Sequence, residues 1–166
     1  MSEAPEASVP TVPSAQIIAP GTPVPRFMLR REDGTAFTRA DLVARTTVLV
    51  FYPFAFSPVC TDQLSLYQEV LGEIEARGAT IYGVSCDAGY SQKAFREQLG
   101  VNIEQLSDFE PKGETCRALG AYHEGGFPQR ALVVIGPDGV VRWSYQADSP
   151  GELPGANLIF DGLAAV

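Results

Sequence analysis

The apolar and polar positions after residue 26 follow strand and helix periods in turn. The longest β-prone run, Thr47 to Tyr52, is unbroken, which is typical of a strand buried on both faces of a sheet. Residues Pro58 to Arg77 then carry apolar side chains at helical spacing, and Gly78 ends this predicted helix. The other predicted elements are short and bounded by turn residues: strands 27–31, 35–38, 80–85, 130–135 and 140–146, and helices 91–99, 114–119 and 156–165. This order predicts an α/β fold with a mixed central sheet flanked by helices.

The N-terminal segment has a different composition from the rest of the chain. Five prolines fall within residues 1–24, among Ala, Ser, Val and Thr. Proline supplies no backbone donor and disfavours both helix and sheet. We therefore expect residues 1–20 to be a disordered tail and residues 21–166 to form one domain, with Ile17 and Ile18 as the tail positions able to dock on it.

Charge and composition exclude several classes of protein. The chain has 166 residues and a net charge of -8, and an acidic surface argues against nucleic-acid binding, which needs clustered Lys and Arg. No apolar run approaches the ~20 residues that span a bilayer, and the start of the chain lacks the basic and apolar regions of a signal peptide. Three widely spaced cysteines are not a disulfide framework, and they fit a reducing compartment. We expect a cytoplasmic protein with no membrane contact.

The segment with the strongest chemical signal is Pro53 to Thr61, which joins the buried strand to the long helix. Pro58 suits the first turn of a helix, so Cys60 falls in that turn, where unpaired N–H groups and the macrodipole favour a thiolate. Cys60 also continues a helical stripe, formed by Leu64, Tyr67, Leu71 and Ile74, which points its sulfur inward. Position alone leaves two alternatives open, a reactive cysteine and a buried structural one.

The pattern Pro53-x-x-x-Ser57-x-x-Cys60 resembles the peroxiredoxin signature Pro-x-x-x-Thr/Ser-x-x-Cys. Further segments resemble the family in the same order: Gly21 to Leu29, Phe51 to Pro53, Val84 to Asp87 with Ser91 and Phe95, Leu106 to Phe109, and Arg130 to Ile135. The resemblance covers residues 21 to about 165. It is closest to the one-cysteine alkyl hydroperoxide reductase E type, with the bacterioferritin-comigratory type as a near neighbour.

The resemblance implies a thioredoxin-like fold with an N-terminal hairpin, and a thiol-dependent peroxidase that reduces hydrogen peroxide and organic hydroperoxides. Cys60 would be the nucleophile that becomes sulfenic acid, and Pro53 would shield its sulfur from water. The Ser57 hydroxyl, the Arg130 guanidinium and the backbone N–H groups of Val59 and Cys60 would bind the peroxide. The resemblance also implies a homodimer through the loop edges around the site. Neither a cofactor nor a metal is expected, since no cysteine or histidine pair has ligand spacing.

Three positions depart from the family pattern. Ser57 replaces the common Thr, which keeps the hydroxyl but loses the methyl group that fixes its rotamer. Gln63 stands where the family often has Glu, so any partner charge for an arginine there is lost. Arg26 replaces an acidic residue before the first strand.

Favouring the thiolate cannot by itself explain a fast reaction. Lowering the pKa of a free cysteine from ~8.5 to ~6 raises its thiolate fraction at pH 7 about thirty-fold. The same change weakens the nucleophile about thirteen-fold if the Brønsted slope of thiol–disulfide exchange applies, which leaves a gain of about two- to three-fold. The site must therefore stabilise the transition state, and fixed donors such as Arg130 are suited to that task.

The other candidate residues leave alternatives. Cys86 and Cys116 could resolve the sulfenic acid only after local unfolding, so we favour a one-cysteine mechanism with an external reductant, a low-molecular-weight thiol or a thioredoxin-class protein. A hydrolytic Cys60–His123 pair is disfavoured because His123 lies in a Gly-rich loop. A dithiol oxidoreductase would need Cys at position 63. A binding module or redox sensor with this fold but without turnover is the remaining alternative.

Overall fold

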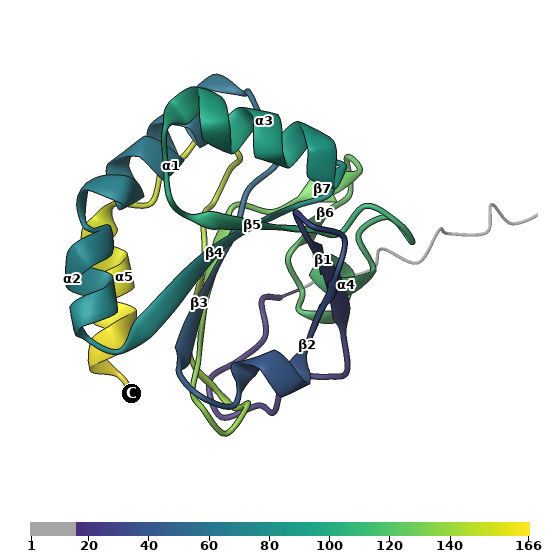
Figure 1. Cartoon of the computed structure of the whole chain (residues 1–166). Helices are drawn as coiled ribbons and strands as arrows, with labels where there is room; N and C mark the ends of the chain where they lie inside the picture. Colours follow the sequence, from purple (N-terminus) through teal and green to yellow (C-terminus); the bar gives the residue numbers. More distant parts are fainter. Residues whose placement is uncertain (1–15) are drawn as a thin grey trace, which may run out of the picture.

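The computed structural model describes residues 16–166 (Figure 1). Its strands are β1 (Met28–Arg31), β2 (Ala36–Thr38), β3 (Thr46–Phe51), β4 (Ala79–Ser85), β5 (Glu104–Ser107), β6 (Tyr122–His123), β7 (Phe127–Pro128), β8 (Ala131–Ile135) and β9 (Val141–Gln146). Its helices are η1 (Arg39–Leu42), α1 (Pro58–Glu69), α2 (Leu71–Ala76), α3 (Gly89–Leu99), α4 (Glu114–Ala118) and α5 (Ala156–Ala164).

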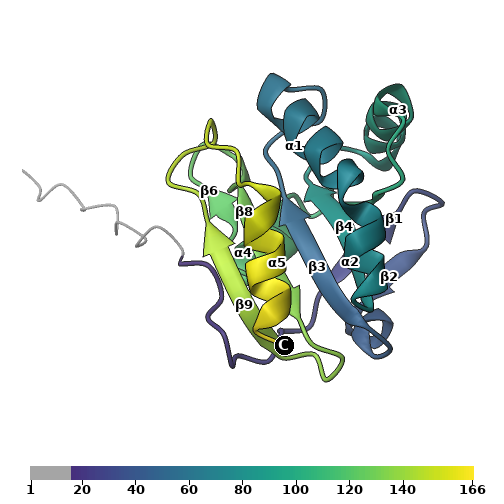
Figure 2. The same ribbon diagram turned by 90° about the vertical axis from the view of Figure 1, so that its left-hand side faces the viewer.

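The described residues build one large mixed sheet in the order β2-β1-β5-β4-β3-β8-β9, and β6 pairs with β7 beside it. The three inner strands β3, β4 and β5 are parallel, while β1 and β8 join them in antiparallel fashion. Figure 2 shows α1, α2 and α5 in front of this sheet, and Figure 1 shows α4 on its other side. The predicted mixed sheet with flanking helices is confirmed.

The central strand β3 divides the core into two halves. Val48 and Val50 face the half that contains Leu64 of α1 and Ile159 of α5, which we call the helix-side core. Leu49 and Phe51 face the opposite half. This half, the N-terminal-side core, contains residues of the entering chain, β1, η1 and α4: Val24, Phe27, Leu29, Leu42, Cys116 and Leu119. Because side chains alternate along a strand, one uninterrupted apolar run supplies both halves.

Several features differ from the sequence prediction, since η1, β6 and β7 were not expected either, and two of the differences affect the core. The predicted helix 58–77 is two helices, because Val70 leaves helical geometry with φ -108° and ψ 7°. Val70 is β-branched and Gly72 follows closely, and both are weak helix formers. Strand β5 was not predicted, since its alternation of Glu104, Gln105 and Leu106 is only partly apolar. Gln105 is nevertheless buried, and its side chain accepts a 2.6 Å hydrogen bond from the Tyr52 hydroxyl.

The entering chain packs against the domain. Residues 1–15 of the predicted disordered tail lie outside the described residues. Residues 16–20 do not behave as a tail: Ile17 and Ile18 pack on the N-terminal-side core, and the Ile18 N–H donates to the Leu119 carbonyl at 2.9 Å. The predicted boundary at residue 20 is therefore too late for this stretch. None of the helices within residues 16–166 has the length and apolar content required to cross a membrane.

Candidate active site

Cys60 lies in the first turn of α1, as predicted, with Pro58 as the first helical residue and Ser57 before it. The predicted inward stripe is confirmed, because Cys60 and the four apolar residues that continue it are all buried in the helix-side core: Leu64, Tyr67, Leu71 and Ile74. Cys60 has no exposed surface. Its sulfur is thus held inside the domain at the carboxyl end of β3, the edge where open α/β sheets place their sites.

Arg130 is the hydrogen-bond partner of the Cys60 sulfur. Its Nη2 donates to Cys60 Sγ at 3.3 Å, its Nε donates to the Pro150 carbonyl at 2.8 Å, and its Nη1 donates to Oε1 of Gln63. Arg130 immediately precedes β8, where Leu132 and Val134 face the helix-side core. The two-residue period of the strand therefore directs Arg130 to the face that holds Cys60.

The charge of Arg130 is unusual for its surroundings. The residue is only 2% exposed, yet no carboxylate forms an ion pair with it among residues 16–166. Two of its acceptors, the Pro150 carbonyl and the Gln63 amide, are neutral. A buried cation without a counter-charge is strongly disfavoured. The Cys60 sulfur is the one acceptor of the three that can carry a negative charge.

A model of the AhpC/TSA family matches residues 20–144. The chain belongs to this family. Alkyl hydroperoxide reductase E of Mycobacterium tuberculosis is 30% identical over 148 residues, which cover 88% of this chain and 96% of the relative. The peroxiredoxin resemblance and the thiol peroxidase activity that it implied are thereby confirmed.

Solved structures agree with the family assignment. The peroxidoxin BcpB of Mycobacterium tuberculosis aligns with a TM-score of 0.74 and 25% identity, covering 89% of this chain and 96% of that one. Reduced Prx3 of Vibrio vulnificus, solved in complex with hydrogen peroxide, aligns with a TM-score of 0.79 and 25% identity, covering 89% and 99%. The architecture of this peroxiredoxin is therefore the thioredoxin-like fold.

Gln63 is a site residue that the sequence analysis considered only as the loss of a negative charge beside an arginine. Its carbonyl oxygen accepts from Arg130, and its amide nitrogen donates to the Tyr67 hydroxyl at 3.1 Å. The Tyr67 hydroxyl in turn donates to the Pro154 carbonyl at 2.7 Å. Burial raises the pKa of Tyr67 to about 12, so this hydroxyl stays a donor at physiological pH. These hydrogen bonds hold the Arg130 guanidinium in position on the side away from Cys60. Cys60, Gln63 and Tyr67 are spaced so that they share one face of the helix, and this spacing could have identified Gln63 as a site residue from the sequence.

The loop before Cys60 is anchored from the neighbouring strand. The Ala55 N–H donates to Oδ2 of Asp87 at 2.8 Å, and Asp87 follows β4 directly. Phe56 has a φ of 68°, an uncommon left-handed conformation for a residue other than glycine, and its ring packs on Phe95 at 5.2 Å. Asp87 is a second site residue that sequence reasoning missed, because it was noticed only as part of a family motif.

The structure brings together some of the other predicted groups and not all. Pro53 is buried at the start of the loop. The Ser57 hydroxyl donates to the Phe54 carbonyl at 3.0 Å and forms no side-chain cap on the helix. Because the first helical bond of α1 runs from the Thr61 N–H to the Ser57 carbonyl, the amides of Val59 and Cys60 lie before the helical ladder.

The remaining candidates lie elsewhere. Nδ1 of His123 accepts from the Gly125 N–H at 2.9 Å, and the imidazole stacks on Phe127 with ring centroids 4.4 Å apart. The disfavoured Cys60–His123 pair thus has no support, because the sulfur faces Arg130. Cys86 and Cys116 pack with the N-terminal-side core, on the face of the sheet opposite Cys60.

Proposed function

We propose that Cys60 is the peroxidatic cysteine of this thiol peroxidase and that Arg130 is its principal electrostatic partner. The observation that carries the proposal is the 3.3 Å contact between the Arg130 guanidinium and the Cys60 sulfur, at a site where no carboxylate from residues 16–166 pairs with the arginine. The ionised sulfur would attack one oxygen of a hydroperoxide, and the O–O bond would break. Cys60 then becomes sulfenic acid, while the second oxygen leaves as alkoxide or hydroxide and takes up a proton.

The donors around the sulfur suit this charge movement. Arg130 can release one N–H from the thiolate to the departing oxygen, as transition-state stabilisation requires. The amides of Val59 and Cys60 have no acceptor in the helical ladder and are suited to bind the peroxide. Ser57 would join them by rotating its hydroxyl away from Phe54, a single χ1 change. Pro53, already buried, would exclude water.

Access to the sulfur requires motion. Cys60 has no exposed surface, so a hydroperoxide reaches it only when part of the wall moves aside. The loop from Pro53 to Val59 is the element we expect to move, because Phe56 is held there in a disfavoured backbone conformation. The proposed substrates are hydrogen peroxide and organic hydroperoxides. Similarity to an alkyl hydroperoxide reductase and to a structure with bound hydrogen peroxide supports both.

We further propose a one-cysteine cycle completed by an external reductant, a low-molecular-weight thiol or a thioredoxin-class protein. The placement of Cys86 and Cys116 beyond the sheet supports it, because a disulfide needs Cα atoms within about 7 Å. A homodimer through the loop edges is proposed on the half-exposed rings of Phe54 and Phe56. A cytoplasmic location is proposed because three free cysteines suit a reducing compartment.

The test is a single-turnover measurement. The purified, reduced protein is given one equivalent of hydrogen peroxide without reductant, and dimedone is added to trap sulfenic acid. We expect stoichiometric loss of peroxide and a dimedone adduct on Cys60, followed by multiple turnovers once an external thiol is present. An adduct that maps to another cysteine would reject the assignment of Cys60. Stoichiometric oxidation without turnover under any thiol would favour the redox-sensor alternative.

A further inference from the structure

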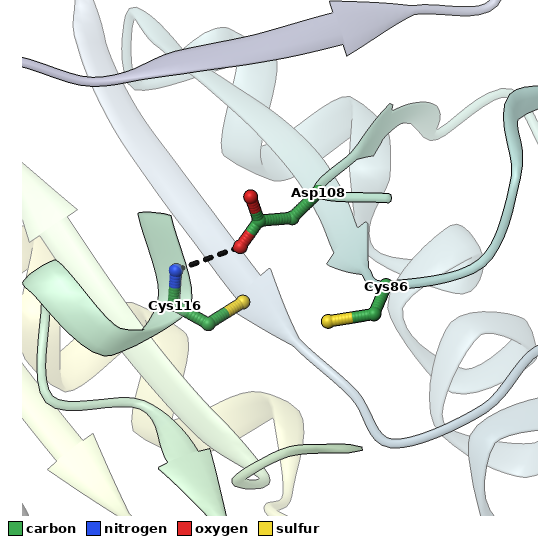
Figure 3. Close-up of side chains that lie close together, drawn as sticks. All are labelled: Cys86, Asp108 and Cys116. Carbon is green, nitrogen blue, oxygen red and sulfur yellow. Dashed lines mark hydrogen bonds between the residues drawn. The ribbon is translucent and has the colours of Figure 1, made fainter. Parts of the chain in front are cut away.

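A second thiol cluster lies on the face of the sheet away from Cys60. The sulfurs of Cys86 and Cys116 and a carboxylate oxygen of Asp108 all lie within 4.8 Å of one another. Cys86 directly follows β4, Asp108 directly follows β5, and Cys116 belongs to α4. Figure 3 shows the two sulfurs pointing toward each other, with the Asp108 carboxylate beside Cys116.

The backbone holds this cluster in place. The Asp108 N–H donates to the Ser85 carbonyl at 2.8 Å, which joins the ends of β4 and β5. The Asp108 carboxylate accepts from the N–H of Thr115 at 3.2 Å. It also accepts from the N–H of Cys116 at 2.8 Å, the bond that Figure 3 shows. Asp108 thus links the start of α4 to the carboxyl ends of β4 and β5. Cys116 is thereby positioned against Cys86, the residue that follows Ser85.

The two thiols have unequal surroundings. Cys116 is fully buried, and this burial raises the pKa of its thiol. The neighbouring Cys116 thiol lowers the pKa of Cys86. As a whole residue Cys86 is only partly buried, so it is more exposed than Cys116. A more exposed thiol of lowered pKa beside a fully buried thiol suits an attacking and a resolving cysteine.

We propose that Cys86 and Cys116 form a second redox site, in which a hydroperoxide oxidises Cys86 and Cys116 closes an intramolecular disulfide without the participation of Cys60. The Cys86 thiolate attacks one oxygen of the hydroperoxide, the O–O bond breaks, and the leaving alkoxide or hydroxide is protonated by solvent. The Cys116 sulfur then attacks the sulfur of the Cys86 sulfenic acid. The S–O bond breaks, and the departing hydroxide takes the Cys116 proton to form water. Two thiols are oxidised, and one hydroperoxide is reduced to an alcohol or water.

A metal ion is the rival occupant of the cluster. Two thiolates and a carboxylate are a ligand set that zinc accepts. Both oxygens of Asp108 already accept backbone amides, however, and these bonds hold α4 in place. Coordination would have to compete with them, whereas a disulfide requires only the two sulfurs that already face each other. The geometry therefore favours the disulfide.

The experiment uses Cys60→Ser, which removes the peroxidatic thiol and leaves the pair intact. The reduced variant is treated with a small excess of hydrogen peroxide, alkylated in denaturant and measured by intact mass. We expect alkylation of neither cysteine, a mass about 2 Da below the reduced, unalkylated protein, and a cross-linked peptide that joins Cys86 to Cys116. The matched control is Cys60→Ser with Cys86→Ser. In this variant we expect Cys116 to be alkylated in denaturant, because its buried thiol reacts slowly with hydrogen peroxide in the folded protein.

A second measurement keeps the proposal falsifiable if oxidation proves slow. Native alkylation of Cys86 is followed against pH in Cys60→Ser, with and without Cys116→Ala, after circular dichroism has verified the fold. We expect the midpoint to move to higher pH when the Cys116 donor is removed. An unchanged midpoint would overturn the pairing. Two alkylatable thiols after peroxide would also overturn it, as would one equivalent of zinc that copurifies and protects both thiols until chelation.

Discussion

The two thiol sites of this protein use the same residue type in opposite electrostatic surroundings. Cys60 faces a buried guanidinium that pairs with no carboxylate in the described part of the chain, whereas the Cys86–Cys116 pair lies beside the Asp108 carboxylate. Cys60 lies in the first turn of a helix of twelve residues, while Cys116 lies in a helix of five residues in which the amides of Thr115 and Cys116 already bind Asp108. The comparison teaches that the two faces of one thioredoxin-like sheet can surround a cysteine with opposite charges. Under the roles proposed above, these charges and the free donors on each face set the difference in reactivity between the two sites.

The largest expected effect tests the Cys60 side of this comparison. Cys60→Ser should abolish peroxidase turnover with external thiol while the fold persists, because Cys60 supplies the sulfur that Arg130 contacts and Cys86 and Cys116 lie on the other face of the sheet. The measurement is peroxide consumption under steady-state conditions, with circular dichroism as the fold control. Turnover within a few-fold of the parent would end the assignment.

Arg130→Met comes next, since it removes the charge and keeps the bulk. If Arg130 only favoured the thiolate, raising the pH would restore the full rate. We expect instead that the pH-independent plateau of the second-order rate falls by roughly ten- to a thousand-fold, as for one lost transition-state donor. Stopped-flow fluorescence of Trp143 from pH 5 to 10 gives this plateau, and Arg130→Lys is the matched control that keeps charge without the fork of donors. A plateau equal to the parent's would refute the role.

Asp87 joins the two sites, because it anchors the Cys60 loop and directly follows Cys86. Asp87→Ala removes a charge-assisted hydrogen bond to Ala55, and the loosened loop should lower the peroxide rate roughly three- to thirty-fold. Asp87→Asn keeps an acceptor and should recover most of the rate. Equal effects of both variants would show that the bond to Ala55 does not position the loop.

A smaller effect is expected from the entering chain, which packs on the same half of the core as Cys116. Deletion of residues 2–15 should leave the melting temperature unchanged. Deletion of residues 2–18 also removes Ile17 and Ile18, whose burial is worth about 2 kcal/mol, so the melting temperature should fall by about 4–8 °C. Differential scanning calorimetry compares the two, and equal melting temperatures would mean that the docked segment adds no stability.

The smallest expected effect belongs to Cys86→Ser combined with Cys116→Ser. Because the pair lies across the sheet from Cys60, the peroxide rate at Cys60 should stay within about two-fold of the parent. Turnover with external thiol should persist as well. A variant that forms sulfenic acid but fails to cycle would instead assign a resolving role to one of these cysteines.

Local patterns predicted the parts of the site that depend on one element. Helical spacing placed Cys60 on the inward stripe of α1, and family resemblance added Ser57, Pro53 and Arg130. The contacts that hold these residues in position, which join segments far apart in the sequence, could not be predicted in the same way. Gln63 binds Arg130 across 67 positions of sequence, and Cys86 meets Cys116 only because β4 and β5 are neighbours and Asp108 ties down α4. Such contacts depend on which strands are neighbours in the sheet, and the periodicity of apolar residues does not predict strand pairing.

The neutral Gln63 has a consequence for the order of events in the catalytic cycle. Under the proposed mechanism, the negative charge that balances Arg130 exists only while Cys60 is a thiolate. Conversion to sulfenic acid removes that charge and leaves a buried cation with neutral neighbours, a state that favours hydration of the guanidinium. The form in which Cys60 is fully buried is thus most stable before oxidation, when a small hydroperoxide must enter. It is least stable after oxidation, when a bulkier reductant must enter. A carboxylate at position 63 would keep Arg130 neutralised throughout and would uncouple opening from oxidation.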